Sequence, residues 1–192
     1  RGLGDVYKRQ ELGEEQLSEF RKKQLGFIFQ EYNLLDTLTL EENIMLVMTL
    51  HRRGKKEIQK RCSELLRILG IEEVKDKYPY QVSGGQKQRC ACAHALANHP
   101  TLLLADEPTG ALDSLSAQTL LETFTDMNQN MGATILMVTH DAFSASYCSR
   151  ILFLKDGKIF HELVRGGKER RAFLNEILDV MTLTGGERSH DV

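Results

Sequence analysis

The sequence of 192 residues lacks several features that would each assign it to a class of proteins. No run approaches the 18 or so uninterrupted apolar residues that a membrane-spanning helix needs, and no signal peptide is legible, so a membrane role would have to come through a partner. The 25 Lys and Arg residues are offset by 27 Asp and Glu, which leaves a net charge of −2. Because such a chain has no dominating basic field, we expect no nucleic-acid partner.

The four cysteines show no C-x-x-C pair and no nearby histidines at a metal-binding spacing; they are Cys62, Cys90, Cys92 and Cys148. We expect them to be reduced thiols in the core of a cytoplasmic protein. The composition, 41% hydrophobic and 27% charged, is typical of a globular domain with one substantial core.

A phosphate-binding loop of the form G-x-x-x-x-G-K-[ST] does not occur in these 192 residues. The Gly-Lys pairs, which begin at Gly54, Gly157 and Gly167, lack both the spaced upstream glycine and the following Ser or Thr.

Two motifs stand out in what is present. Residues 82–89 read VSGGQKQR, and an apolar run from Leu102 ends in Asp106-Glu107-Pro108. A Ser-Gly-Gly turn that opens a helix offers free backbone N–H groups and the positive helix end to a phosphate. An Asp-Glu pair after an apolar strand supplies a metal ligand and a base. Alone, the first motif also reads as a capped helix and the second as a surface turn, but together they predict ATP chemistry.

In this order and at this separation, the two motifs resemble the signature and Walker B motifs of the ABC-type ATPases, which sandwich each nucleotide between two facing subunits. The resemblance covers residues 11 to about 165. It implies an α/β fold: a P-loop NTPase-like, RecA-like core with a mainly parallel sheet and an inserted α-helical subdomain at about residues 31–96. Residues 166–192 are expected to form a C-terminal helix and a mobile tail.

In that family the phosphate-binding loop precedes the glutamine segment found here at Gln30, in a unit of roughly 30 or more residues. Only 29 residues precede Gln30, and the first ten, RGLGDVYKRQ, resemble translated adapter sequence. We therefore expect residues 1–10 to be a non-native leader, with an ordinary basic N-terminus as the alternative. Residues 11–165 are expected to be a partial nucleotide-binding domain with its N-terminal part missing, inactive by itself.

The resemblance assigns catalytic roles at the ends of three expected strands. Gln30, after the run 25–29, matches the Q-loop glutamine near the metal and the attacking water. Asp106 would support Mg²⁺ and Glu107 would be the general base that takes the water's proton. His140, after the run 133–139, matches the switch histidine that contacts the γ-phosphate. Without these neighbours, a lone Gln or His at a strand end is usually structural.

The resemblance also assigns nucleotide-binding roles to the signature, which comprises Ser83, Gly84, Gly85 and Gln86. Ser83 is expected to cap the helix and donate to phosphate, and the glycines let the backbone approach the ligand. In the family the signature faces the nucleotide of the opposite subunit, so a two-fold dimer completes two sites. Asp113 matches the D-loop aspartate, but it can equally be a helix cap.

His94 departs from the family pattern, because most relatives carry arginine at this position. An imidazole cannot reproduce the forked donors of a guanidinium, which leaves contacts from this position in doubt.

Apolar periodicity predicts the remaining elements. One helix face contains Ile58, Cys62, Leu65, Leu66 and Leu69 and should end at Gly70; a second contains Leu120, Phe124, Met127 and Met131. Helices are also expected at residues 14–24 and 168–181, and Pro79 should impose an extended approach to the signature. Residues 133–139 are expected to form a buried strand, and Asp156-Gly157 predicts a hairpin between residues 151–154 and 158–161.

The segments FQEYNLLDTLTLEENI (29–44) and DEPTGALDS (106–114) resemble the ATP-binding subunits of macrolide, lipoprotein-release and, in particular, bacitracin-type antimicrobial-peptide exporters. This implies ATP and Mg²⁺ as cofactors, a second ATPase protomer and an integral-membrane permease as partners, and a cytoplasmic location at the inner face of the membrane. ATP hydrolysis would power export or removal of antimicrobial peptides, lipopeptides or similar compounds.

Two alternatives stay open at this point. One is a non-transport ABC ATPase that acts on DNA or ribosomes, for which a long coiled coil or a second nucleotide domain would be expected; neither appears here. The other is an inactive or regulatory remnant that uses its signature to complete another protein's site.

Overall fold

The computed structural model describes residues 13, 18, 21, 24–29, 31–50 and 53–185. The leader at residues 1–10, most of the helix expected at residues 14–24, Gln30, and the tail after Gly185 lie outside these ranges. The described elements are, in order, β1 (Leu25–Ile28), α3 (Leu40–Leu50), α4 (Lys55–Ile68), the 3-10 turns η2 (Glu72–Val74) and η3 (Pro79–Gln81), α5 (Gly84–Leu96), β2 (Leu102–Asp106), α6 (Ser114–Met131), β3 (Thr134–Val138), α7 (Ala142–Ala145), β4 (Arg150–Lys155), β5 (Lys158–Val164) and α8 (Arg170–Gly185).

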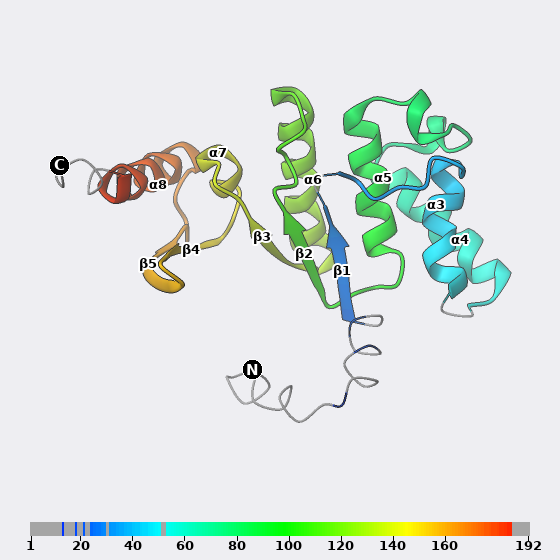
Figure 1. The fold of residues 1–192 in the computed structure, drawn as a ribbon, viewed down its shortest axis with the longest axis horizontal. Coiled ribbons are helices and arrows are strands. Elements are labelled where there is room, and N and C mark those ends of the chain that lie inside the picture. The colour runs from blue at the N-terminus through cyan, green and yellow to red at the C-terminus, as the bar shows by residue number, and fades with distance from the viewer. Residues whose placement is uncertain are drawn as a thin grey trace.

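Strands β1, β2 and β3 form a parallel sheet in that order, as the α/β interpretation predicts. In register, Ile28 lies opposite Ala105, and Ala105 opposite Met137. Parallel pairing brings the carboxyl ends of the three strands to one edge of the sheet, where residues 29, 107 and 139 continue the chain. Helices α5 and α6 begin at this same edge (Figure 1), because each runs antiparallel to the strands beside it.

Helices α5 and α6 cover one face of the sheet within the described ranges. On that face Ile28, Leu103 and Ala105 are buried, and Ile135 and Met137 pack against the core. On the other face Leu136 and Val138 remain more than half exposed. A strand forms here as expected, but the expectation that it is buried is wrong: its side chains alternate between exposed and partly buried, and only alternate ones meet the described helices.

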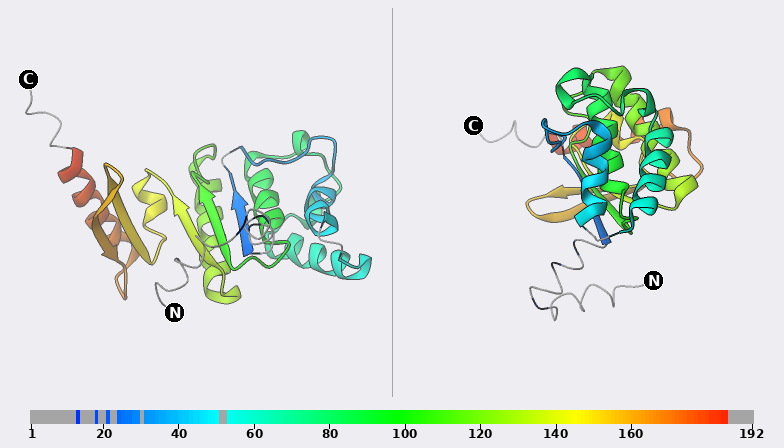
Figure 2. Two further views of the ribbon diagram at one scale, coloured as in Figure 1. Left: turned by 60° about the horizontal axis from the view of Figure 1, so that its bottom comes forward. Right: turned by 90° about the vertical axis from the view of Figure 1, so that its right-hand side faces the viewer.

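Helices α3, α4 and α5 pack together beside the sheet, as Figures 1 and 2 show. The five residues predicted as one face of α4 are all buried, and Gly70 follows the helix at φ 62°, which confirms the helix stop. Arg61 of α4 donates to the carbonyl of Leu96 in α5 at 3.1 Å, which ties these two helices at depth. The approach to the signature is extended at Tyr78 and Val82, but Pro79–Gln81 between them is a 3-10 turn.

The described cysteines form no disulfide. Burial raises the pKa of Cys62 and of Cys90 to about 12, so both thiols stay protonated, as the core interpretation predicts. No helix among the described residues is both long and apolar enough to cross a membrane.

The hairpin of β4 and β5 lies on the opposite side of the sheet from α3 and α4 (Figure 2). Its turn has Asp156 at φ 51° and Gly157 at φ 75°, the left-handed pair that a type I′ turn requires, as predicted. Helix α8 packs against α7, where the Arg170 guanidinium lies 4.5 Å from the Tyr147 ring centre. Helix α8 confirms the helix expected at residues 168–181; its Phe173 and Ile177 are buried, whereas Leu178 is 45% exposed.

Gly26 sets how closely α5 approaches β1. A Cβ at Gly26 would lie 2.5 Å from the carbonyl oxygen of Ala95 and 2.6 Å from a methyl group of Leu103. We predict that Gly26→Ala lowers the free energy of unfolding by about 1–3 kcal/mol, because a backbone oxygen cannot yield as a flexible side chain can. Urea denaturation of the 192-residue chain measures this loss.

Gly167→Ala is the matched control, since a Cβ there meets nothing within 4 Å. Its effect should stay within about 0.5 kcal/mol. If Gly26→Ala and Gly167→Ala unfold at the same urea concentration, the close packing of α5 on β1 is contradicted.

Candidate functional site

The carboxyl edge of the parallel sheet gathers polar residues that follow β2 and β3. The last register pair joins Asp106 to Val138, and the next residue, Glu107, donates its N–H to the carbonyl of Val138 at 2.9 Å. Glu107 has φ 42°, in the left-handed region that few residues other than glycine adopt. This turn brings the Glu107 side chain to the segment that follows β3.

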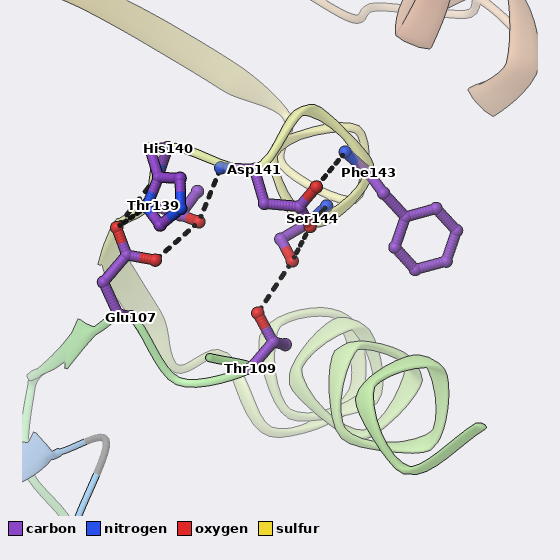
Figure 3. A network of polar contacts seen from close by, with 7 residues as sticks. All are labelled: Glu107, Thr109, Thr139, His140, Asp141, Phe143 and Ser144. Carbon is purple, nitrogen blue, oxygen red and sulfur yellow. Dashed lines mark hydrogen bonds and ion pairs between the residues drawn. The ribbon is translucent and has the colours of Figure 1, made fainter. Parts of the chain in front are cut away.

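Three groups of that segment bind the Glu107 carboxylate (Figure 3). The Thr139 hydroxyl donates to Oε2 at 3.1 Å, and the backbone N–H of His140 donates to Oε1 at 3.0 Å. Nδ1 of His140 lies 2.8 Å from the same Oε1. Two of the predicted catalytic residues are therefore in direct contact, although 32 residues separate them in the chain.

The contact with Glu107 raises the pKa of His140, first through the hydrogen bond and then through the charge of the carboxylate. The imidazole itself is 87% exposed, while Glu107 is 24% exposed. The histidine thus faces solvent on one side and the carboxylate on the other, a position from which it can meet a ligand at the edge of the sheet.

Asp106 ends β2 with an exposed carboxylate that has no hydrogen bond or ion pair within the described ranges. It lies next to Glu107 in the chain but makes none of the contacts that hold the Glu107 carboxylate, which permits separate roles for the two carboxylates. Gln30 lies outside the described residues, so its role near the metal and the water stays a prediction. The strand that leads to it, β1, ends level with Ala105.

The signature forms a second group at the beginning of α5. Ser83 caps the helix: its hydroxyl accepts from the N–H of Gln86 at 3.2 Å, and the Gln86 side chain accepts from the N–H of Ser83 at 3.0 Å. The capping role predicted for Ser83 is thus observed, and Gln86 completes the box. Burial lowers the pKa of His94, further along α5, which favours the neutral imidazole.

The signature glycines are needed for packing within the chain as well as for approach to a ligand. A Cβ at Gly84 would lie 3.2 Å from the Tyr32 hydroxyl, and one at Gly85 would lie 3.0 Å from the Ser116 hydroxyl. These neighbours come from the turn after β1 and from the first turn of α6. A side chain at either glycine would therefore need the neighbouring hydroxyl group to shift by a few tenths of an ångström.

Asp113 is the N-cap of α6, the reading that the sequence left open. Its carboxylate accepts from the N–H of Ser116 at 2.9 Å, from the Ser116 hydroxyl at 2.8 Å and from the N–H of Leu115. These bonds, led by those from Ser116, lower the pKa of Asp113. Through Ser116, Asp113 adjoins the signature, so the D-loop and signature residues form one group.

Sequence reasoning missed the hydroxyls around Glu107 and His140, which belong to Thr109, Thr139 and Ser144. Thr109 and Thr139 lie inside the recognised segments, but a threonine beside a carboxylate has no distinctive pattern. Ser144 lies in a short helix with no sequence signal of its own. The contacts of these three hydroxyls become visible only in the structure, where the segments after β2 and β3 lie side by side.

Comparison with known proteins gives a consistent result. Residues 4–110 match the family described as ABC transporter. The bacitracin export ATP-binding protein BceA of Halalkalibacterium halodurans is 50% identical over 175 residues, which cover 91% of this chain and 69% of that protein. The ABC transporter ATP-binding protein YxdL of Bacillus subtilis is 49% identical over 170 residues, which cover 88% of this chain and 66% of that protein.

The fold matches a solved cassette as well. The ATP-binding cassette MJ0796 of Methanocaldococcus jannaschii, in a dimeric post-hydrolysis state bound to ADP and Pi, superimposes with a TM-score of 0.71 at 38% identity. The match covers 82% of this chain and 69% of that one. The chain thus spans about two thirds of the length of the proteins it resembles.

We predict that Glu107→Gln lowers the pKa of His140 towards the ordinary histidine value. A carboxylate stabilises the imidazolium, so removing its charge makes the protonated form less favourable at any pH between the two values. Titration of the histidine ring protons by NMR in the 192-residue chain measures the shift.

The control is Glu162→Gln, on β5, where the lost carboxylate pairs with Arg150 and not with a histidine. It should leave the His140 titration unchanged. An unaltered pKa in Glu107→Gln would show that the carboxylate and the imidazole do not meet in solution.

Proposed function

Since the chain belongs to the ABC transporter family, as one of its ATP-binding subunits, we propose that Glu107 and His140 serve ATP hydrolysis that drives a membrane permease. The contact between Glu107 and His140 carries this proposal. It couples a carboxylate that can take a proton from water to an exposed imidazole that can contact the terminal phosphate.

Glu107 suits the role of general base because its carboxylate is held at the strand end by three hydrogen bonds and is still partly open to solvent. In P-loop ATPases the protein's task is to position water and neutralise charge around the phosphate. Thr139 and the backbone N–H of His140 fix the direction of the carboxylate. The ring of His140 is the part of this pair that can turn towards an incoming phosphate.

Asp106 is the residue that would support Mg²⁺. Its carboxylate is exposed at the carboxyl edge and lacks a competing partner among the described residues, which fits a hard cation that prefers oxygen ligands. Mg²⁺ commonly binds through one or two carboxylates together with substrate phosphates, and bound Mg²⁺ would neutralise phosphate charge. Within the described ranges no three metal-binding side chains cluster, so Asp106 would act with the phosphates and, as predicted, Gln30.

The signature group would complete the site of a second protomer. The N–H groups of Gly84 and Gly85 have no acceptor within the described part of the chain, and Ser83 is exposed at the start of the helix. These donors lie where an anion binds a helix N-terminus. The dimeric cassette to which this chain is similar supports a second protomer as partner. In that dimer Asp113, which binds Ser116 beside Gly85, would lie near the shared boundary.

We propose a bacitracin-type exporter as the setting, because the similar Halalkalibacterium protein is named as a bacitracin export subunit. The partner would be an integral-membrane permease, and the subunit would lie at the cytoplasmic face of the membrane. The transported compound would be an antimicrobial peptide or a lipid-linked molecule of that kind.

The test of hydrolysis joins the 192-residue chain to a segment that carries a G-x-x-x-x-G-K-[ST] loop from an ABC ATPase. We predict that this joined protein hydrolyses ATP and that Glu107→Gln lowers kcat by at least about a hundredfold, because a positioned base contributes on that scale. ATP binding, measured by a fluorescent analogue, should persist in the variant.

Glu162→Gln in the joined protein is the control and should keep the parent rate. Normal hydrolysis by Glu107→Gln would disprove its role as base. A joined protein that binds ATP but never hydrolyses it would favour the remnant reading.

The role of the signature in a dimer can be separated from its role as a cap. We predict that Ser83→Asn keeps the stability of the fold, since Asn caps helices as well as Ser does, but abolishes ATP-dependent dimers of the Glu107→Gln joined protein. The larger amide would occupy the space of the partner's phosphate. Size-exclusion chromatography with ATP measures dimer formation.

Ser63→Asn, at an exposed position of α4, makes the same chemical change away from the signature and Asp113 and should leave the dimer intact. Dimers of unchanged affinity in Ser83→Asn would argue against the proposed nucleotide contact.

A further inference from the structure

A chain of hydroxyl and carboxylate groups connects the segment after β2 to the segment after β3 (Figure 3). Ser144, in α7, is fully buried, and its hydroxyl lies 2.6 Å from Oδ2 of Asp141 and 3.0 Å from the hydroxyl of Thr109. Because Ser144 gives its single proton to the carboxylate, it accepts the proton of Thr109. The order of donation is therefore Thr109 to Ser144 to Asp141.

The Asp141 carboxylate fixes the orientation of the Ser144 side chain. Its carboxylate also accepts the N–H groups of Phe143 at 3.2 Å and Ser144 at 2.9 Å, so it caps α7 while it orients the Ser144 hydroxyl. Desolvation by itself would raise the pKa of Asp141. The hydrogen bonds from Ser144 and Phe143, together with the nearby His140, outweigh it and lower the pKa overall. The acceptor thus stays ionised, which strengthens its bond to Ser144.

Apart from the Thr109–Ser144 bond, the hydrogen bonds between these two segments end, among the described residues, on one group, the Glu107 carboxylate. The Thr139 hydroxyl, the backbone N–H of His140 and Nδ1 of the His140 ring bind it. A carboxylate that turns to a water molecule must loosen at least part of this set. The bond from Thr109 to Ser144 joins the same two segments two residues after Glu107 and four after His140, and it does not use that carboxylate.

We propose that Ser144 is a positioning residue: its hydroxyl fastens the His140 segment to the Glu107 segment through Thr109, so that His140 stays in reach while the Glu107 carboxylate is engaged in hydrolysis. The claim that this tie assists hydrolysis, the catalytic half of the inference, rests on the proposed function. The claim that Ser144 holds the two segments together, the structural half, does not. This Thr109–Ser144 tie holds the two segments together through side chains other than the proposed catalytic pair.

The test measures amide proton exchange of His140 by NMR in the 192-residue chain, since this N–H donates to Glu107. Thr109→Val, which removes only the hydroxyl bond to Ser144, should speed exchange about fivefold, the scale of one lost hydrogen bond. Ser144→Ala should speed it at least as much, and the double variant no more than Ser144→Ala alone. Thr109→Ser, which keeps the hydroxyl, should restore the parent rate.

Ser146→Ala is the matched control. Ser146 is equally buried and ends the same short helix, but its hydroxyl donates to the carbonyl of Phe143 and does not reach Thr109. It should leave the His140 exchange rate unchanged. An equal acceleration in Ser146→Ala, or none in Thr109→Val, would overturn the tie.

The catalytic half is tested in the joined protein with the phosphate-binding loop. Thr109→Val should lower kcat about fivefold with an unchanged KM for ATP, and Thr109→Ser should restore it. If Thr109→Val speeds exchange of the His140 amide proton but leaves kcat unchanged, the link to hydrolysis is overturned while the structural role of the Thr109–Ser144 bond stands. A joined protein without any hydrolysis would instead count against the proposed function, and the exchange result would still decide the tie.

Discussion

The parallel register of β2 on β3 is the constraint on which the site depends. The ladder runs to Asp106 opposite Val138 and gains one more bond, from the N–H of Glu107 to the carbonyl of Val138. Both strands therefore end at the same level, and the residues that follow them meet. A register shifted by one residue would turn every side chain of β3 to the other face and would carry His140 away from Glu107.

The backbone at Glu107 shows how the chain uses this meeting. A left-handed non-glycine residue costs on the order of 1–3 kcal/mol and persists only where its surroundings fix it. Here the N–H is bound to β3, and the carboxylate accepts from Thr139 and His140. The unusual conformation begins a turn directly after the strand, closed by the bond from the N–H of Gly110 to the carbonyl of Glu107, and the carboxylate stays at the sheet edge.

Short-range patterns predicted much of the fold because they are set by local chemistry. Apolar runs marked β1, β2 and β3, the Asp156-Gly157 pair marked its hairpin, and Gly70 marked a helix end. The exposure of Leu136 could not be read in this way, since a run of apolar residues shows that a strand can be buried but not which described element covers it. In the site, the motifs named Glu107 and His140 separately. The contact between Glu107 and His140, and the bond from Thr109 to Ser144, depend on strand register. Neither can be read from the sequence of one segment alone.

The segment from Glu107 to Ser116 joins the two groups of functional residues. At its beginning Glu107 is bound to the residues after β3, and at its end Ser116 binds Asp113 and abuts Gly85. Between them, Thr109 adds the bond to Ser144. In the proposed dimer the first group serves the chain's own nucleotide and the second serves the partner's. A displacement at either end has only ten residues over which to be absorbed, and those residues are held at three points. In the proposed dimer this short segment would be the physical route between the two nucleotide sites, since its position is fixed from β3 at one end and from α5 at the other.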